Sequence, residues 1–151
     1  MKYVLEINVA IPLDEFAKKM DNADNLKHWQ KGFQSYEHIS GIPGKIGAKT
    51  KFNYMFKNRK MDLIETIIES NFPHSFQATY DTKGMHNIQN NIFKEIDKGQ
   101  TKWISECEFL PTNFIMRFTT LFMKNSFKKQ SLNYMKYFKN FAENGTSVTE
   151  N

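Results

Sequence analysis

The feature that most constrains this chain is a series of six strand-like segments closed by one long helical segment. The strand-like segments span 33–39, 49–57, 61–70, 75–81, 85–96 and 101–110, and apolar residues follow helical spacing over 114–142. Gly, Pro, Asn and Asp residues typical of turns separate the segments. Because short connections join neighbouring antiparallel strands, the sequence predicts one antiparallel sheet with a long helix against it.

The first 30 residues predict one more strand and two short helices. Residues 3–9 alternate between apolar and polar side chains, as a half-buried strand does. Helices are expected over 13–20 and 24–29, the second with Asp21 or Asn22 as its N-cap. A length of 151 residues suits one domain. The prediction is an α+β fold in which a curved seven-stranded antiparallel sheet wraps a long C-terminal helix, with a domain over 1–144 and a flexible tail over 145–151.

Alternation within the strands indicates which side chains face the interior. Phe52, Tyr54 and Phe56 share one face of their strand, opposite lysine and asparagine side chains. In the segment 85–96 neither face is uniformly apolar, so its register stays open, and with it the direction of Asn87 and Asn91. One helix does not readily fill a strongly curved sheet, so an internal cavity is expected.

Charge and sequence motifs argue against several functional classes. The net charge is +5, but the lysines are scattered without an arginine-rich cluster, which favours a solvated basic surface over a nucleic-acid site. Transient contact with an anionic membrane surface stays open as the alternative. The four histidines are dispersed and Cys107 has no partner thiol, so neither a metal nor another cofactor is expected. The single cysteine and the absence of a cleavable leader predict a cytoplasmic protein.

Several short segments occur in an order that resembles a known superfamily. They are Val9-Ala10-Ile11-Pro12 with Phe16, Asp24-Asn25-Leu26 leading to Trp29, Pro43-Gly44-Lys45-Ile46-Gly47, Asn71-Phe72-Pro73, and Gly99-Gln100-Thr101-Lys102-Trp103. Together with the closing helix they resemble the START-like (SRPBCC) domains of the polyketide cyclase/dehydrase type, which share the helix-grip fold with the pollen allergen Bet v 1. The resemblance implies a cavity between helix and sheet, entered near the N-terminal half of the helix, but no particular reaction.

Aromatic residues make up 15% of the chain and are the main candidates for walls of the expected cavity. Amide and hydroxyl side chains would then act as polar anchors, and two phenylalanines of the long helix would lie at the entrance. Gln89 and Glu65 are further candidates for inward-facing polar residues, but no catalytic residue is assigned. The predicted ligand-binding residues are Phe52, Tyr54, Phe76, Tyr80, Asn87, Asn91, Phe93, Trp103, Ser105, Phe118, Phe122 and Tyr134.

The function favoured by these features is binding or carriage of a small hydrophobic or aromatic ligand, such as a lipid, a quinone or a polyketide-like molecule. The first alternative is an enzyme of the cyclase or dehydratase type that uses polar residues of the cavity. A further alternative is a protein-interaction module of the chaperone co-activator kind, acting through the apolar segment 114–123. The identity of the ligand stays open, as does the choice between a monomer and a homodimer.

Overall fold

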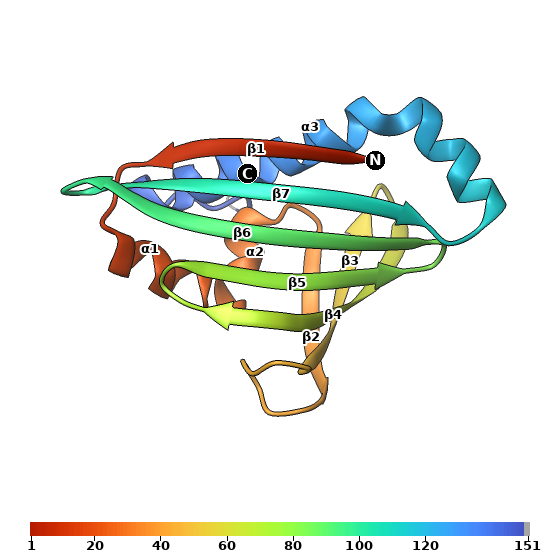
Figure 1. Ribbon diagram of the computed structural model, residues 1–151, viewed down its shortest axis with the longest axis horizontal. Coiled ribbons are helices and arrows are strands. Elements are labelled where there is room, and N and C mark those ends of the chain that lie inside the picture. Colours follow the sequence, from red (N-terminus) through yellow and green to blue (C-terminus); the bar gives the residue numbers. More distant parts are fainter. Residues whose placement is uncertain (150–151) are drawn as a thin grey trace.

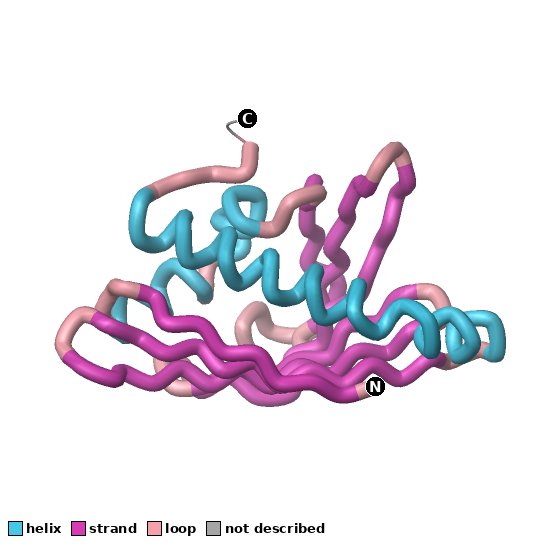
Figure 2. The backbone as a smooth tube through the Cα atoms, turned by 90° about the horizontal axis from the view of Figure 1, so that it is seen from above, coloured by secondary structure: helices cyan, strands magenta, loops and turns pink. Residues whose placement is uncertain are grey.

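A computed structural model describes residues 1–149 of the chain. Its seven strands form one antiparallel sheet in the order β1-β7-β6-β5-β4-β3-β2, and its helices lie on one side of that sheet (Figures 1 and 2). The elements in chain order are β1 (Lys2–Val9), α1 (Leu13–Met20), the short 3-10 helix η1 (Ala23–Asn25), α2 (Leu26–Trp29), β2 (Phe33–Ser40), β3 (Lys49–Phe56), β4 (Arg59–Asn71), β5 (Ser75–Thr82), β6 (Met85–Asp97), β7 (Gln100–Pro111) and α3 (Phe114–Asn144). The predicted α+β architecture is therefore confirmed.

Helix α3 begins and ends at residues with a clear physical reason for each boundary. Asn113 is the N-cap, and its Oδ1 accepts a hydrogen bond from the backbone N–H of Met116 at 2.8 Å. Gly145 follows the last turn with a φ of +70°, a left-handed conformation that glycine adopts without strain. The helix crosses the inner face of the sheet and packs mainly on β1, β7 and α2 (Figure 2).

The pairing of β6 resolves the register that the sequence left open. Asn87 lies opposite Phe109 of β7, and Asn91 lies opposite Ser105. Phe109 stacks on Phe127 of α3 with ring centroids 5.0 Å apart, so this face of the sheet is the inner one. Because alternate residues share a face, Asn87, Asn91 and their odd-numbered neighbours on β6 point toward the helix.

One end of the inner face is filled by an aromatic cluster. Phe16 of α1 lies 4.9 Å from Phe138 of α3 and 5.0 Å from Phe93 of β6, measured between ring centroids. Trp29 and Trp103 meet edge to face at 6.1 Å beside them. All five side chains are buried. We refer to these five residues as the aromatic cluster. The aromatic cluster anchors α1, α2 and the C-terminal half of α3 to the sheet.

Residues 147 and 148, within the predicted tail, contact α2. Ser147 is buried and its hydroxyl pairs with Nδ1 of His28 at 2.9 Å. The backbone N–H of Val148 donates to the carbonyl of His28 at 3.0 Å. These two bonds hold the segment against α2. The polar composition of residues 145–151 alone does not indicate such a contact. Residues 150 and 151 lie outside the described residues.

Candidate ligand-binding site

A row of polar side chains crosses the inner face of the sheet next to the aromatic cluster. The strand pairings place Tyr80 opposite Asn87 on one side and opposite Glu65 on the other. Glu65 in turn lies opposite Thr50 of β3. Directly opposed side chains on one face have Cβ atoms about 5 Å apart, so the four form a continuous line. The polar row is Asn87, Tyr80, Glu65 and Thr50, running from β6 to β3.

The centre of the polar row is a hydrogen-bonded pair formed by Tyr80 and Glu65. The Tyr80 hydroxyl donates to Oε2 of Glu65 at 2.9 Å. Burial raises the pKa of Glu65 to about 7, the hydrogen bond from Tyr80 opposes that rise, and the negative charge of Asp21 adds to it. Burial also raises the pKa of Tyr80 well above its ordinary value, so the phenol stays protonated. Near neutral pH, Glu65 is therefore present both as acid and as carboxylate.

Asn87, at one end of the polar row, has a carbonyl group with no partner in the protein. Its Oδ1 is shielded from solvent and accepts no hydrogen bond from any residue that the structure describes. Buried polar atoms are nearly always hydrogen-bonded, because an unpaired one costs about 1–3 kcal/mol. The second atom of this kind is Nε1 of Trp29, which belongs to the aromatic cluster. Asn87 Oδ1 is thus a vacant acceptor next to the Tyr80–Glu65 pair.

Two further tyrosines connect the site to the segment after α2. The Tyr54 hydroxyl donates to Oε1 of Gln30 at 2.6 Å. The Tyr134 hydroxyl, from α3, donates to the carbonyl of Lys31 at 3.1 Å. Burial raises the pKa of Tyr134 to about 12 and raises that of Tyr54 well above its ordinary value. Both stay neutral and hold β3 and α3 against the same loop.

The structure places the predicted binding residues in three groups. Around the polar row lie Phe52, Tyr54, Tyr80 and Asn87, with Tyr134 on the facing helix. Phe76 lies farther along β5, opposite Asn91, and stacks on Phe72 with ring centroids 5.4 Å apart. Phe52, Tyr54 and Asn87 are buried, whereas Phe76, Tyr80 and Tyr134 are half-buried. Their assignment as ligand contacts stays a prediction.

A second group already has protein partners for its polar atoms. Oδ1 of Asn91 accepts from Nε1 of Trp103 at 3.0 Å, and the Ser105 hydroxyl lies 3.5 Å from the Cys107 sulfur. Phe93 is 2% exposed and, like Trp103, belongs to the aromatic cluster. These four predicted residues therefore shape the filled end of the inner face, while their contact with a ligand stays a prediction.

The third group consists of Phe118 and Phe122 on the first half of α3. Their rings pack on one another with centroids 5.2 Å apart. Phe118 is 60% exposed and Phe122 is 75% exposed, so both rings lie on the outside of the molecule. Their role at an entrance also stays a prediction.

Two hollows in the surface lie away from the space between α3 and the sheet. One has a volume of about 490 Å³ and is lined by Asp14, Ala17, Lys18, Asp21, Asn22, Phe72 and Pro73. The other has a volume of about 350 Å³ and is lined by Gln34, Asn53, Tyr54, Met55, Lys60 and Asp62. Neither has a lining residue from α3, and Tyr54 is the predicted binding residue that they include. The cavity expected under α3 stays a prediction.

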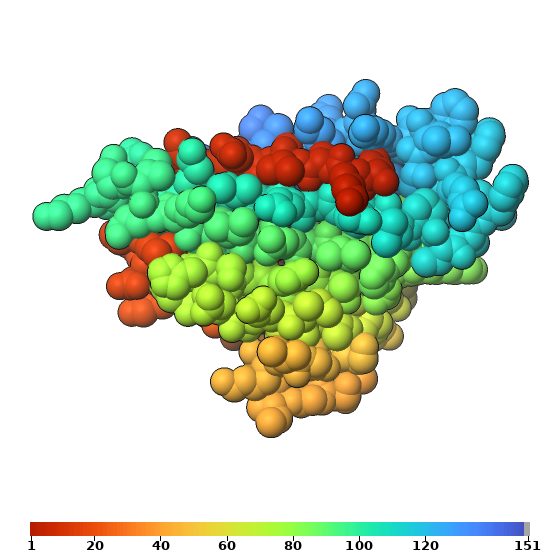
Figure 3. Space-filling view, in the orientation of Figure 1, coloured from red at the N-terminus to blue at the C-terminus, as the bar shows by residue number. Residues whose placement is uncertain are grey.

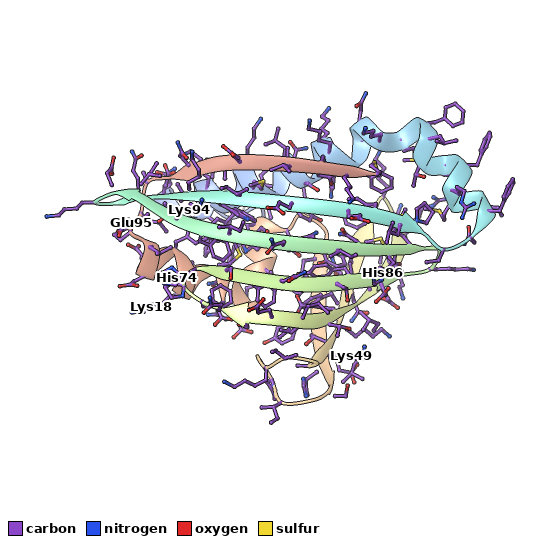
Figure 4. The ribbon with its side chains drawn as sticks, viewed as in Figure 1. Lys18, Lys49, His74, His86, Lys94 and Glu95 are labelled. Atoms are coloured by element: carbon purple, nitrogen blue, oxygen red, sulfur yellow. The ribbon has the colours of Figure 1, made fainter. Side chains whose placement is uncertain are left out.

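Glu65 is the functional candidate that the sequence analysis did not assign. Alternation in β4 places Glu65 on the same face as Leu63 and Ile67. A carboxylate between apolar residues of one strand face indicates that Glu65 points inward. The proximity of Asp21, which lies more than 40 positions earlier, had no signal in the sequence. His86, which lies on the outer face of β6 (Figure 4), forms a close pair with Asp81 of β5, so neither takes part in the polar row.

Within residues 1–149, no group of three His, Cys, Asp or Glu side chains converges in a way that could hold a metal ion. In the same part of the chain, no helix has both the length and the apolar composition needed to cross a membrane.

The sheet, its wrapped helix and the short helices after β1 form a helix-grip fold, as predicted. The structure is similar to the aromatase/cyclase ZhuI of Streptomyces sp. R1128, with a TM-score of 0.80 and 8% identity over 99% of this chain and 98% of that one. It is similar to Ara h 8.0201, with a TM-score of 0.72 and 13% identity over 94% and 97%. It also matches the di-domain aromatase/cyclase StfQ of the steffimycin pathway, with a TM-score of 0.73 and 13% identity over 96% of this chain and 45% of that one. No family model matches the sequence, and neither does any curated protein.

Proposed function

We propose that this protein binds a small apolar or aromatic molecule that carries a hydroxyl or another hydrogen-bond donor. The observation that carries the proposal is the vacant Asn87 acceptor beside the Tyr80–Glu65 pair, on the inner face of the sheet. Sites for small molecules commonly combine apolar walls with a few converging polar groups. The walls in this proposal are Phe52 and Tyr54 of β3.

The chemistry of the polar row favours a ligand that donates hydrogen bonds. Asn87 offers its Oδ1, and Tyr80 already uses its proton on Glu65, so its oxygen can only accept. Glu65 and the nearby Asp21 oppose a negative charge in the site. A neutral phenol or alcohol therefore fits better than a carboxylate of the same shape. The similarity in fold to two aromatase/cyclases supports an apolar ligand without naming one.

The direct test is native mass spectrometry of the full chain purified from its own cells, followed by denaturing extraction of any bound molecule. Recovery of a stoichiometric apolar compound with a donor group would support the proposal and identify the ligand. Recovery of a strongly anionic compound would contradict the predicted chemistry of the polar row.

A second test uses matched probes and calorimetric titration. We expect 2-naphthol to bind more tightly than naphthalene, which lacks the donor, and than 2-naphthoate, which carries a negative charge. Asn87→Leu should remove the preference for 2-naphthol over naphthalene, because the vacant acceptor is gone. Asn90→Leu is the matched control, since Asn90 lies on the opposite face of the same strand. Equal affinity for the three probes would refute the proposal.

A second candidate function is acid–base catalysis of the cyclase or dehydratase type. The observation that favours it is the pKa of about 7 for Glu65, because a carboxyl group at that value can both accept and donate a proton near neutral pH. In such a reaction Glu65 would take a proton from the carbon next to a carbonyl group, and Tyr80 would hold the carboxylate in place. Turnover of a polyketone substrate that disappears in Glu65→Gln, with the fold intact, would establish it. Unchanged turnover in that variant would exclude Glu65 as the base.

A further inference from the structure

The first half of α3 exposes more large apolar side chains than any other part of the described chain. This part of the helix projects beyond the sheet in the space-filling view (Figure 3), and its side chains extend away from the sheet (Figure 4). An exposed apolar surface of this kind usually marks an interaction site. The exposed fractions are 81% for Phe114, 75% for Ile115, 60% for Phe118, 74% for Leu121, 75% for Phe122 and 42% for Met123.

Helical geometry directs most of these side chains away from the protein. At about 100° per residue, the positions from 114 to 122 that are apolar and most exposed fall within an arc of roughly 120°. The opposite side of the helix carries Thr120, which is buried, and Phe127, which stacks on Phe109 of the sheet. We call Phe114, Ile115, Phe118, Leu121 and Phe122 the apolar stripe. It has no role in holding α3 to the sheet.

The surroundings of the apolar stripe are positively charged. Arg117 and Lys124 lie along one edge of the stripe, and Lys128 and Lys129 follow in the next turn, all of them exposed. No Asp or Glu occurs from residue 114 to residue 142. An apolar face flanked by cationic side chains is the pattern of helices that lie in the interface of an anionic bilayer.

We propose that the first half of α3 docks the protein on an anionic lipid bilayer. The apolar stripe enters the boundary between headgroups and acyl chains, with the helix axis along the membrane plane. Arg117, Lys124 and Lys128 contact lipid phosphates. Charge complementarity favours lipid over a second copy of the chain, because two such helices would bring cations of the same sign together.

Docking would also place one end of the polar row close to the bilayer. Phe127 lies on the same helix as the stripe and stacks on Phe109, which is the direct neighbour of Asn87. For the ligand binding proposed above, this arrangement gives an apolar molecule a route between membrane and protein. The docking itself does not depend on that function, and its test requires no ligand.

The experiment is flotation of the full chain with vesicles of phosphatidylcholine alone or mixed with phosphatidylglycerol. We expect binding to the mixed vesicles, weaker binding to phosphatidylcholine, and release at high salt. Phe118→Ser with Phe122→Ser should lower partitioning at least about tenfold, because two large apolar side chains no longer enter the interface. Ile42→Ser with Ile46→Ser is the matched control, since both isoleucines are more than 70% exposed but lie in the loop between β2 and β3.

A charge-reversal pair separates the electrostatic contribution. Lys124→Glu with Lys128→Glu should weaken binding to the mixed vesicles by about fivefold or more for each residue, while Lys94→Glu with Lys98→Glu at the far hairpin should have a small effect. Circular dichroism confirms that each variant is folded. The proposal is overturned if the wild-type chain does not float with mixed vesicles. It is also overturned if sedimentation shows a dimer that Phe118→Ser with Phe122→Ser dissociates, because a second copy then covers the stripe.

Discussion

The two ends of the inner face of the sheet differ in how the space between the sheet and the helices is occupied. At one end, five buried aromatic residues from the sheet and three helices fill the space. There Trp103 and Asn91 pair their polar atoms, and Nε1 of Trp29 has no partner among the described residues. At the other end, the polar row leaves the Asn87 carbonyl unpaired and holds a carboxyl group with an elevated pKa. The first arrangement stabilises the fold, whereas the second lowers stability locally. Such a cost is typical of sites where a ligand supplies the missing partner.

The sharpest way to test this comparison is to remove one aromatic ring from each end. Phe138 is fully buried in the aromatic cluster, so Phe138→Ala should reduce the free energy of unfolding by about 3–5 kcal/mol. Tyr80 is only half-buried at the centre of the polar row, and Tyr80→Leu should cost less than about 2 kcal/mol. Urea unfolding of both variants measures the difference. Equal losses would mean that the two ends contribute alike to the fold.

The second prediction concerns the pH dependence that Glu65 gives to stability. Its pKa is 4.5 ordinarily and about 7 in the folded protein, so folding disfavours its ionised form. The contribution of protonated Glu65 to the free energy of unfolding is fully present below pH 4.5. It is lost as the pH rises toward 7. Glu65→Gln is neutral at every pH. Its stability relative to wild type should therefore rise by about 3 kcal/mol across that range and stay constant above it.

Urea unfolding at a series of pH values measures this effect, with Glu69→Gln as the control. Glu69 lies on the same strand but is exposed, so its replacement should change stability little at any pH. A parallel pH dependence for wild type and Glu65→Gln would show that Glu65 is not held in the apolar environment described here.

The third prediction compares the two inward asparagines of β6. Asn91→Leu leaves the indole N–H of Trp103 buried without an acceptor, so it should destabilise the protein by about 1–3 kcal/mol. Asn87→Leu removes a carbonyl that has no partner, so it should be neutral or slightly stabilising. Thermal unfolding monitored by circular dichroism distinguishes these outcomes. A larger loss for Asn87→Leu would mean that its side chain has a structural role.

Much of this fold could be predicted because its signals are local. Alternation over 49–57 and 101–110 identified β3 and β7, and turn residues marked the connections between strands. The register of β6 could not be predicted, because Asn87 and Asn91 look like surface residues when read in isolation. Only pairing with β5 and β7 decides that they face inward, and pairing is a property of the sheet rather than of the strand.

The candidate site was partly predictable for the same reason. Tyr54 and Phe52 were predicted from residue type and strand face, and Asn87 from residue type alone, but the importance of Glu65 depends on partners from other elements. Tyr80 approaches it from the next strand, and Asp21 comes from the end of α1. A pKa is a property of this three-dimensional environment, so no pattern along the chain reveals it. The packing of Ser147 on His28 was missed because a short polar tail has no periodicity to read.

The smallest expected effect concerns the hydrogen bond at the centre of the polar row. Because the bond from Tyr80 stabilises the carboxylate and lowers the pKa of Glu65, Tyr80→Phe should raise that pKa above its wild-type value near 7. The change corresponds to about 1 kcal/mol. Carbon NMR of labelled glutamate carboxyl groups, followed against pH, measures it directly. Tyr134→Phe is the control, because that hydroxyl donates to the carbonyl of Lys31 instead. A fall in the pKa of Glu65 in Tyr80→Phe would mean that burial by the phenol ring outweighs its hydrogen bond, and Tyr80 would then act on Glu65 by excluding water.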